Sequence, residues 1–324
     1  MLRQLARRTM VGLAVIAGVV ALTFALLQLA PGDPVTRLLG PTATPEQIAV
    51  QRRALALDQP LPIQFAAWVG RALRGDWGRS LATGQPVAEM LGHAWPATVR
   101  LVALSLLASY LIGMMVGVAQ AARTATRTDT ALSVVTVTLF AAPGYWLGLM
   151  LMMAGTYWLH VFPAFGAAGL DADYLDGWAR YGDALRHLAL PFLTLTLIGV
   201  GGVARYTRGS LLEVQAEPFM VTARAKGLSP ARVLTRHALR NALTPIVTLL
   251  GLSLPALFSG AVFVEAVFAW PGVGRVLVEA VRARDYPVVM AATTISAMLV
   301  VAGNLLADLL AARLDPRVRR TGGV

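Results

Sequence analysis

The sequence predicts an all-α polytopic membrane protein with six transmembrane helices, and three observations support this fold class. Of the 324 residues 56% are hydrophobic and only 14% are charged, with a mean hydropathy of +0.64, whereas soluble domains carry roughly a quarter charged residues. The apolar residues fall in uninterrupted blocks, and a helix needs about 20 of them to cross a bilayer core. Basic residues gather in alternate connections between these blocks, as the positive-inside rule describes.

Six apolar blocks define the predicted spans, which run over Thr9–Ala30, Thr98–Gln120, Thr130–Leu159, Leu188–Tyr206, Leu243–Phe263 and Val288–Ala312. The first block follows three Arg residues, as the apolar region of a signal peptide does. Its length of about 22 residues exceeds that of a signal peptide, however, and no small-residue cleavage site follows it. We therefore interpret the first block as a retained span.

Charge predicts the orientation of the spans. The N-terminal tail has three Arg and no acid, and the connection between the fourth and fifth spans has seven bases against two acids. The segment 160–187 has four Asp against two Arg, as expected of the outer side. Both termini are thus expected in the cytoplasm of a bacterium, with the spans in its plasma (inner) membrane. The net charge of +11 is mostly this topology signal, so nucleic acid is not an expected partner.

The predicted organisation has four parts. They are the N-terminal tail and first span (1–30), an extracytoplasmic segment (31–97), a transmembrane core (98–312) that contains a cytoplasmic loop (218–240), and a cytoplasmic tail (313–324). In the extracytoplasmic segment, Thr44 and Gln47 are spaced as a capping box, and apolar residues from 63 to 73 recur at a helical period. This helical insertion fits two roles equally well: a surface that meets an extracytoplasmic partner, or a lid that packs on the helix bundle.

The loop 218–240 reads as two short helices that meet at Gly227. Pro218 suits the first turn of a helix, and Gly227 supplies the left-handed conformation that ends one. Ser229 is a favourable N-cap before Pro230, and the second helix carries a stripe of Arg232, Arg236 and Arg240. A loop lying on anionic lipid headgroups would explain the charges, at about 1 kcal/mol per base, but not the capped first helix with its glycine stop.

Within this loop, Ala223-Arg-Ala-Lys-Gly227, followed by Leu239 and Pro245, resembles the cytoplasmic "EAA" loop of permease subunits of bacterial ATP-binding-cassette importers. The resemblance covers essentially the whole chain, and the chain is similar to the first permease of the dipeptide, oligopeptide and nickel group. Its motifs are Pro31-Gly-Asp-Pro34, Leu57-Asp-Gln-Pro-Leu61, Pro96-Ala-Thr98, Thr222-Ala-Arg-Ala-Lys-Gly-Leu228, His237-Ala-Leu-Arg-Asn-Ala242, Phe268-Ala-Trp-Pro-Gly-Val-Gly-Arg275, Arg284-Asp-Tyr-Pro-Val288 and Leu314-Asp-Pro-Arg317.

The sequence departs from the general importer pattern at four positions. Val221 and Thr222 stand where that pattern has Glu and its first Ala, and His237 and Arg240 stand where it has a later Ile and Pro. The residues at these four positions resemble those of the peptide group. They therefore indicate the peptide subclass of importer permeases, and they do not argue against docking of the loop to an ATPase.

The resemblance implies a type I importer fold whose loop docks into an ATPase. The implied partners are a second permease in a heterodimer, two ATPase subunits that bind ATP and Mg, an extracytoplasmic solute-binding protein and the surrounding lipid. The residues implied to couple the permease to the ATPase are Thr222, Ala223, Arg224, Ala225, Lys226, Gly227, Leu228, Ser229, Arg232 and Arg236.

The residues themselves favour a chain that transports and does not catalyse. A phosphate-binding loop needs Gly-Lys followed by Ser or Thr, but Lys226 is the only lysine and Gly227 follows it. No cofactor is therefore expected in this chain, and ATP hydrolysis is expected in a separate one. The chain has no Cys, which removes thiolate metal sites, and its four His form no metal-binding pair. No catalytic residue and no metal site are expected.

Breaks in the third and fifth spans suggest where a transport pathway lies, because proline and small residues let spans bend around a cavity. Ordinary close packing of helices explains each of these residues equally well. The candidate lining residues are Pro143, Gly144, Tyr145, Ser253, Pro255, Ser259 and Gly260.

The expected function is binding-protein-dependent, ATP-driven import of dipeptides or oligopeptides, with nickel or glutathione as alternative solutes. An ion-coupled secondary transporter is the main competitor, but it would place ionisable residues at mid-membrane. Here Glu265 falls at the outer end of the fifth span and Asp308 near the inner end of the sixth. A membrane scaffold without transport is a third class.

Overall fold

The computed structural model describes residues 2–29, 34–40, 42–54 and 57–314, and the regular secondary structure within these ranges is helical. The described part divides into two units, one formed by 1–97 and 271–301 and the other by 98–270 and 302–324. Most of the turn cluster at 31–34 and the C-terminal tail after Leu314 lie outside the described residues.

The first unit combines the N-terminal region with a helix pair from late in the sequence. Its core is formed by apolar side chains such as Val87, Leu91, Val273 and Val288, all of them buried. Its helices are α1 (Leu2–Leu29), α2 (Pro34–Leu39), α3 (Pro45–Ala54), α4 (Leu61–Ala72), the start of α5 (Val87–Ala122), α12 (Val273–Ala283) and the start of α13 (Tyr286–Leu314).

The segment after α1 contains the short helices that the sequence predicts. The backbone N–H of Thr44 donates to Gln47 Oε1 over 2.9 Å, and the N–H of Gln47 donates to Thr44 Oγ1 over 3.3 Å. This reciprocal pair is a capping box at the start of α3. The predicted amphipathic helix near 63–73 is α4, and Trp77 packs edge-on against Trp68, with ring centroids 6.2 Å apart.

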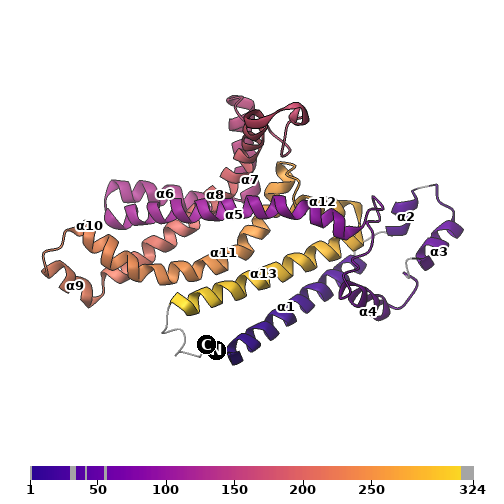
Figure 1. Cartoon of the computed structure of the whole chain (residues 1–324), viewed down its shortest axis with the longest axis horizontal. Helices are drawn as coiled ribbons and strands as arrows, with labels where there is room; N and C mark the ends of the chain where they lie inside the picture. Colours follow the sequence, from indigo (N-terminus) through magenta and orange to yellow (C-terminus); the bar gives the residue numbers. More distant parts are fainter. Residues whose placement is uncertain (1, 30–33, 41, 55–56, 315–324) are drawn as a thin grey trace. The chain divides into compact units, whose positions relative to one another are not determined.

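The second unit contains most of the remaining helices, and Figure 1 shows α5, α6 and α8 running side by side within it. These helices are α6 (Arg127–Ala141), α7 (Gly144–Met152), a π-helical turn (Met153–Trp158), a 3-10 turn (Ala172–Tyr174), α8 (Gly177–Gln215), α9 (Pro218–Ala225), α10 (Pro230–Arg232), a second π-helical turn (Val233–Ala238) and α11 (Leu239–Val267).

Helices α5, α6 and α8 pack closely because small residues line their contacts. The hydroxyl of Ser109 on α5 donates to the carbonyl of Thr196 on α8 over 3.0 Å. A Cβ atom at Gly201 of α8 would lie 2.7 Å from both Phe140 N and Thr136 O of α6, which are backbone atoms. Only glycine permits this approach of α8 to α6, so the three helices form one tightly packed block.

The predicted third span is not one straight helix. It breaks between Ala141 and Gly144, and the helices on either side meet at 106°. Proline disfavours helical backbone in the residue before it, and Ala142, just before Pro143, is extended with φ −67° and ψ 131°. The sequence predicts a bend at this dipeptide, and the structure makes it sharper than an ordinary proline kink.

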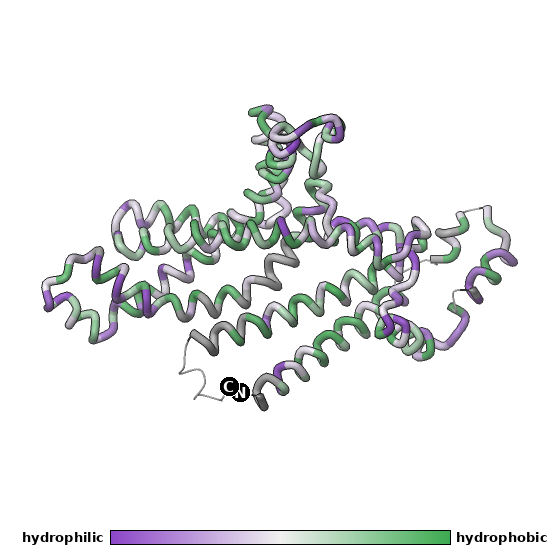
Figure 2. The backbone as a smooth tube through the Cα atoms, in the orientation of Figure 1, coloured by the Kyte–Doolittle hydropathy of each residue, from purple (hydrophilic) through white to green (hydrophobic). Residues whose placement is uncertain are grey.

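The described residues contain four helices that are long and apolar enough to cross a membrane, or five if the bent pair forms one span. They correspond to the first, second, third, fourth and sixth predicted blocks, and the predicted fifth block lies inside α11. Figure 2 shows predominantly hydrophobic colours along α5 and α6. Helices α5 and α8 begin well before their apolar blocks, because hydropathy marks the membrane-compatible part of a helix and not its ends.

Candidate functional site

Helix α9 is the first part of the predicted loop, and its sequence explains both of its ends. Glu217 is the N-cap and Pro218 the first helical residue, where the missing proline N–H costs nothing. Met220 and Ala223 face inward and are buried, whereas Val221 is 64% exposed. The helix therefore has one face anchored in the protein and another that is open.

Gly227 ends α9 as predicted. Its φ is +75°, in the left-handed region that glycine adopts without strain. The N–H of Lys226 donates to the carbonyl of Thr222 over 3.2 Å, and that of Gly227 to the carbonyl of Arg224 over 3.0 Å. No atom lies within 4 Å of where a Cβ would be, so backbone conformation alone requires glycine here.

The second half of the loop differs from the prediction in two ways. Ser229 occupies the N-cap position before Pro230, but its side chain makes no capping hydrogen bond. The expected separate helix is only α10, which continues through a π-helical turn directly into α11. The loop thus joins the fifth predicted span without a break, because no glycine or proline lies between Pro230 and Pro245 to stop the helix.

The buried face of the loop ties it to three long helices. Met220, Ala223, Val233 and Ala238 join one apolar cluster with Ala121 of α5, Leu211 of α8, and Ala242 and Ile246 of α11. This cluster lies entirely within the second unit. Direct side-chain packing therefore joins α9 to α5, α8 and α11.

The open face of the loop is cationic and partly apolar, and we name it the α9–α10 surface. Figure 2 shows hydrophilic colours gathered around the turn between α9 and α10. The surface consists of the exposed residues Phe219, Val221, Thr222, Arg224, Ala225, Lys226, Ser229, Arg232 and Arg236. Of the remaining predicted coupling residues, Ala223 is buried, Leu228 is half-buried and Gly227 shapes the turn. Such a surface suits an acidic groove of another protein or anionic headgroups.

A cavity of about 720 Å³ lies in the second unit among α5, α6, α8 and α11. Much of its lining is apolar, with Leu106, Ile198 and Leu249 on three of these helices. Arg205 and Glu213 of α8 supply its charges, and the guanidinium of Arg205 lies 4.9 Å from the ring centre of Phe140. A cavity of this size accommodates a small solute.

One hydrogen bond joins two helices that line this cavity. The hydroxyls of Tyr110 on α5 and Ser253 on α11 are 2.8 Å apart. Ser253 also donates to the carbonyl of Leu249, one turn earlier, over 2.9 Å. The pair fixes the separation of α5 from α11 beside the cavity.

Among the predicted pathway residues whose side chains the structure describes, only Ser253 lines this cavity. Pro143, Gly144 and Tyr145 lie at the bend before α7 and do not line it. Pro255, Ser259 and Gly260 lie on α11, and their side chains fall outside the described residues.

Sequence reasoning missed the contribution of α8, which supplies more of the described lining residues than any other helix. The residues Gly202, Tyr206, Gly209 and Glu213 all line the cavity from this helix. Their spacing of three or four residues puts them on one helical face. The sequence did contain a signal for this lining: one face of the fourth predicted span has small residues and, near the end of the span, charged residues.

Among the residues that the structure describes, no group of three or more His, Cys, Asp or Glu side chains is placed to hold a metal ion.

The chain matches two protein families that together extend over nearly its whole length. Residues 109–320 match the family described as binding-protein-dependent transport system inner membrane component. Residues 1–110 match the family described as the N-terminal part of binding-protein-dependent transport system membrane components.

Several curated proteins are similar to this chain over more than nine-tenths of both lengths. The oligopeptide transport system permease protein AppB of Bacillus subtilis is 37% identical over 96% of this chain and 98% of its own. The di/tripeptide transport system permease protein DppB of Pseudomonas aeruginosa is 38% identical over 98% and 99%. The glutathione transport system permease protein GsiC of Salmonella choleraesuis is 37% identical over 93% and 94%.

Solved structures with similar folds also exist. A chain from the inward-facing MetNI methionine ABC transporter aligns with a TM-score of 0.55 and 17% identity, covering 71% of this chain and 98% of that one. A chain of an amino acid ABC transporter crystallised with histidines aligns with a TM-score of 0.52 and 14% identity, covering 70% and 94%. At these identities the likeness concerns the fold alone.

Proposed function

Because the chain belongs to the family of binding-protein-dependent transport system inner membrane components, we propose that it forms the translocation pathway for short peptides in an ATP-driven importer. It is a transport component of the inner membrane with several apolar helices. Dependence on a binding protein distinguishes this class from an ion-coupled secondary transporter. The solute is peptide-like, in keeping with relatives named for oligopeptides, di/tripeptides and glutathione. These names favour a peptide over the alternative solute nickel.

The single observation that carries the mechanism is the shape of the α9–α10 surface. A short helix with buried Met220 and Ala223 presents Val221, Arg224 and Lys226 outward, and Gly227 holds the turn that follows. The chain has no phosphate-binding motif of its own, so the energy of ATP must enter through a contact with another protein. We assign that contact to this surface, with ATP and Mg held by two ATPase subunits.

The proposed arrangement has six spans, with both termini and the α9–α10 surface in the cytoplasm. One contact within the second unit supports the assignment of sides. The N–H of Gly166 donates to the carbonyl of Phe268 over 2.9 Å, which favours the same side of the membrane for connection 160–187, with its excess of Asp, and for connection 264–287, whose charges are balanced. On that outer side a solute-binding protein delivers the peptide, and segment 31–97 is the helical insertion it meets.

The cavity among α5, α6, α8 and α11 is this subunit's share of the proposed pathway. A second, similar permease completes the pathway in a heterodimer. Closure of the ATPases on ATP displaces α9, and the shared apolar cluster passes the movement to α5, α8 and α11. The cavity then opens alternately to the two sides.

The test is retention of the ATPase subunits by the purified permease pair. Reversing two charges with Arg224→Glu and Lys226→Glu should abolish retention while leaving the amount of permease in the membrane unchanged. The matched control, Arg71→Glu with Arg74→Glu, changes two exposed bases of the proposed outer segment and should retain the ATPases. Equal retention by both double variants contradicts the assignment of the docking surface.

A further inference from the structure

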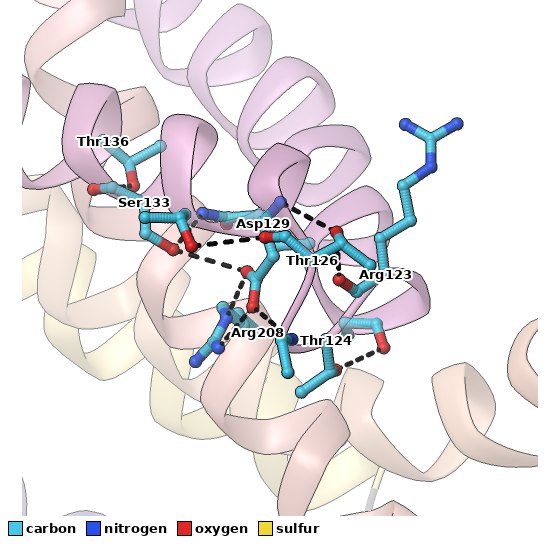
Figure 3. Close-up of polar contacts among 11 residues, drawn as sticks. Arg123, Thr124, Thr126, Asp129, Ser133, Thr136 and Arg208 are labelled. Carbon is cyan, nitrogen blue, oxygen red and sulfur yellow. Dashed lines mark hydrogen bonds and ion pairs between the residues drawn. The ribbon is translucent and has the colours of Figure 1, made fainter.

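An ion pair joins α6 to α8 near the loop end of the second unit. The guanidinium of Arg208 donates from Nε and from Nη2 to the two carboxylate oxygens of Asp129, each over 2.9 Å. Asp129 is only 4% exposed, and Figure 3 shows the forked contact from the two helices. A two-bond fork fixes both the distance and the relative orientation of the groups it joins.

Further donors hold the carboxylate of Asp129 in place. The N–H of Ala125 in the α5–α6 turn donates to it over 3.2 Å, and the hydroxyl of Ser133 over 3.4 Å. Gln120, at the end of α5, donates in turn to Ser133 Oγ over 3.1 Å. Asp129 therefore links the end of α5, the α5–α6 turn, α6 and α8 in one polar network (Figure 3).

Arg208 stands close to the α9–α10 surface along the chain. Helix α8 continues unbroken from Arg208 to Gln215, about two turns, and Ala216 and Glu217 then lead into α9. The apolar cluster around Met220 already ties α9 to Leu211 of α8 and Ala121 of α5. The ion pair adds a directional contact to α6, which contributes no buried residue to that cluster.

We propose that Asp129 and Arg208 are positioning residues that hold α6 and the end of α8 in fixed register, so that a displacement of α9 moves both helices as one body. This rests on the proposed function, in which the ATPases act on α9. Apolar packing alone tolerates sliding between helices, whereas the fork does not. The close approach at Gly201 fixes α8 against α6 farther along the helices, and the ion pair fixes the end nearest the loop.

Three variants separate this role from simple stabilisation. Arg208→Lys keeps the charge but removes the fork. The double variant Asp129→Asn with Arg208→Gln removes both charges together, so no charge is left without its partner. Arg123→Gln is the matched control, because Arg123 lies in the same turn and points away from the network in Figure 3.

The complete transporter in proteoliposomes provides the functional readout. We measure the factor by which the purified binding protein raises ATP hydrolysis above its basal rate. For Arg208→Lys and the neutral double variant we expect unchanged basal hydrolysis and ATPase retention, with the stimulation factor lowered about two- to thirtyfold. Arg123→Gln should keep the wild-type factor.

A distance measurement provides a second readout that needs no solute. The chain has no Cys, so spin labels at Thr128→Cys and Glu217→Cys, both exposed positions, are the only labels on it. We expect one narrow distance distribution with the native pair and a broadened one with Arg208→Lys or the double variant. Wild-type stimulation together with a narrow distribution in both variants would overturn the proposal. Failure of the unaltered transporter to retain ATPases would instead overturn the proposed function beneath it.

Discussion

The carboxylate of Asp285 accepts a hydrogen bond from the backbone N–H of Leu81 over 3.1 Å, between residues 204 positions apart in the sequence. Ala82 N–H donates to it over 3.2 Å. The hydroxyl of Ser80 also donates to this carboxylate. All of these groups belong to the first unit, and Asp285 is buried. Such a contact forms on one side of a membrane only, so it supports the proposal that segments 31–97 and 264–287 share a side. Their common side agrees with the topology proposed from charge.

Replacing Asp285 with Asn should loosen the turn at 80–82. Asparagine has one acceptor oxygen in place of two and brings an NH2 donor toward donors already present. These N–H donors are partly buried, and a fully buried donor left unsatisfied costs about 1–3 kcal/mol, so the amides of Leu81 and Ala82 should exchange hydrogen faster. Glu279→Gln is the control, since its pair with Arg275 is exposed and worth about 0–1 kcal/mol. Unchanged exchange at Leu81 in Asp285→Asn would show that the anchor is dispensable.

Gly227→Ala should destabilise the turn after α9 without any steric clash. A side chain in the left-handed region costs about 1–2 kcal/mol, whereas the surrounding space is open. Gly227→Asn should be milder, because asparagine tolerates this conformation better. ATPase retention by the permease pair reports the effect and should fall in the order glycine, asparagine, alanine.

Gly70→Ala is the control for this series. Gly70 lies inside α4, its Cβ position is also open, and its φ is not positive. Alanine is the better helix former, so this variant should keep full retention. If Gly227→Ala retains the ATPases as well as Gly70→Ala does, the left-handed turn is not required for docking.

Local sequence features predicted much of the described helical structure, because their physics is local. Apolar blocks mark helices, the Thr44 and Gln47 pair marks the start of α3, and Gly227 marks the end of α9. The merging of the second loop helix with α11 was missed, because Ser229 and Pro230 announce where a helix begins and not where it ends. The 106° bend at Pro143 was anticipated as a kink only, since its angle depends on what each half packs against.

The polar contacts between distant segments could not be read from the sequence. Arg208 counted as one more base of a cytoplasmic connection, and its pairing with Asp129 depends on how α6 packs on α8. Tyr110 drew no attention because it sits in an otherwise ordinary apolar block. The pathway prediction followed the proline and glycine positions of the third and fifth spans, so it included Ser253 of α11 and omitted α8, although both helices are continuous. Which face of such a helix borders a cavity is decided by tertiary packing.

The hydrogen bond between Tyr110 and Ser253 should stabilise the contact of α5 with α11 measurably. Tyr110→Phe and Ser253→Ala each remove one partner, and the double variant should cost less than the sum of the two. Interhelical hydrogen bonds in membrane proteins contribute about 0.6 kcal/mol on average, up to about 1.7. Unfolding of the purified protein in detergent–denaturant mixtures measures this cycle. Tyr206→Phe is the control, since that hydroxyl makes no hydrogen bond to a described residue. Strict additivity of the first pair would contradict the coupling.

Gly201→Ala should disrupt the packing of α8 on α6. Its new methyl group would meet the backbone atoms Thr136 O and Phe140 N at 2.7 Å, and backbone cannot move aside as a flexible side chain can. Overpacking of this kind costs about 1–3 kcal/mol, which should lower the thermal unfolding temperature of the detergent-solubilised protein. Gly209→Ala on the same helix is the matched control, because nothing lies within 4 Å of its Cβ position. Equal unfolding temperatures for the two variants would mean that α6 and α8 separate readily, and the block that is proposed to carry movement from α9 would then not be rigid.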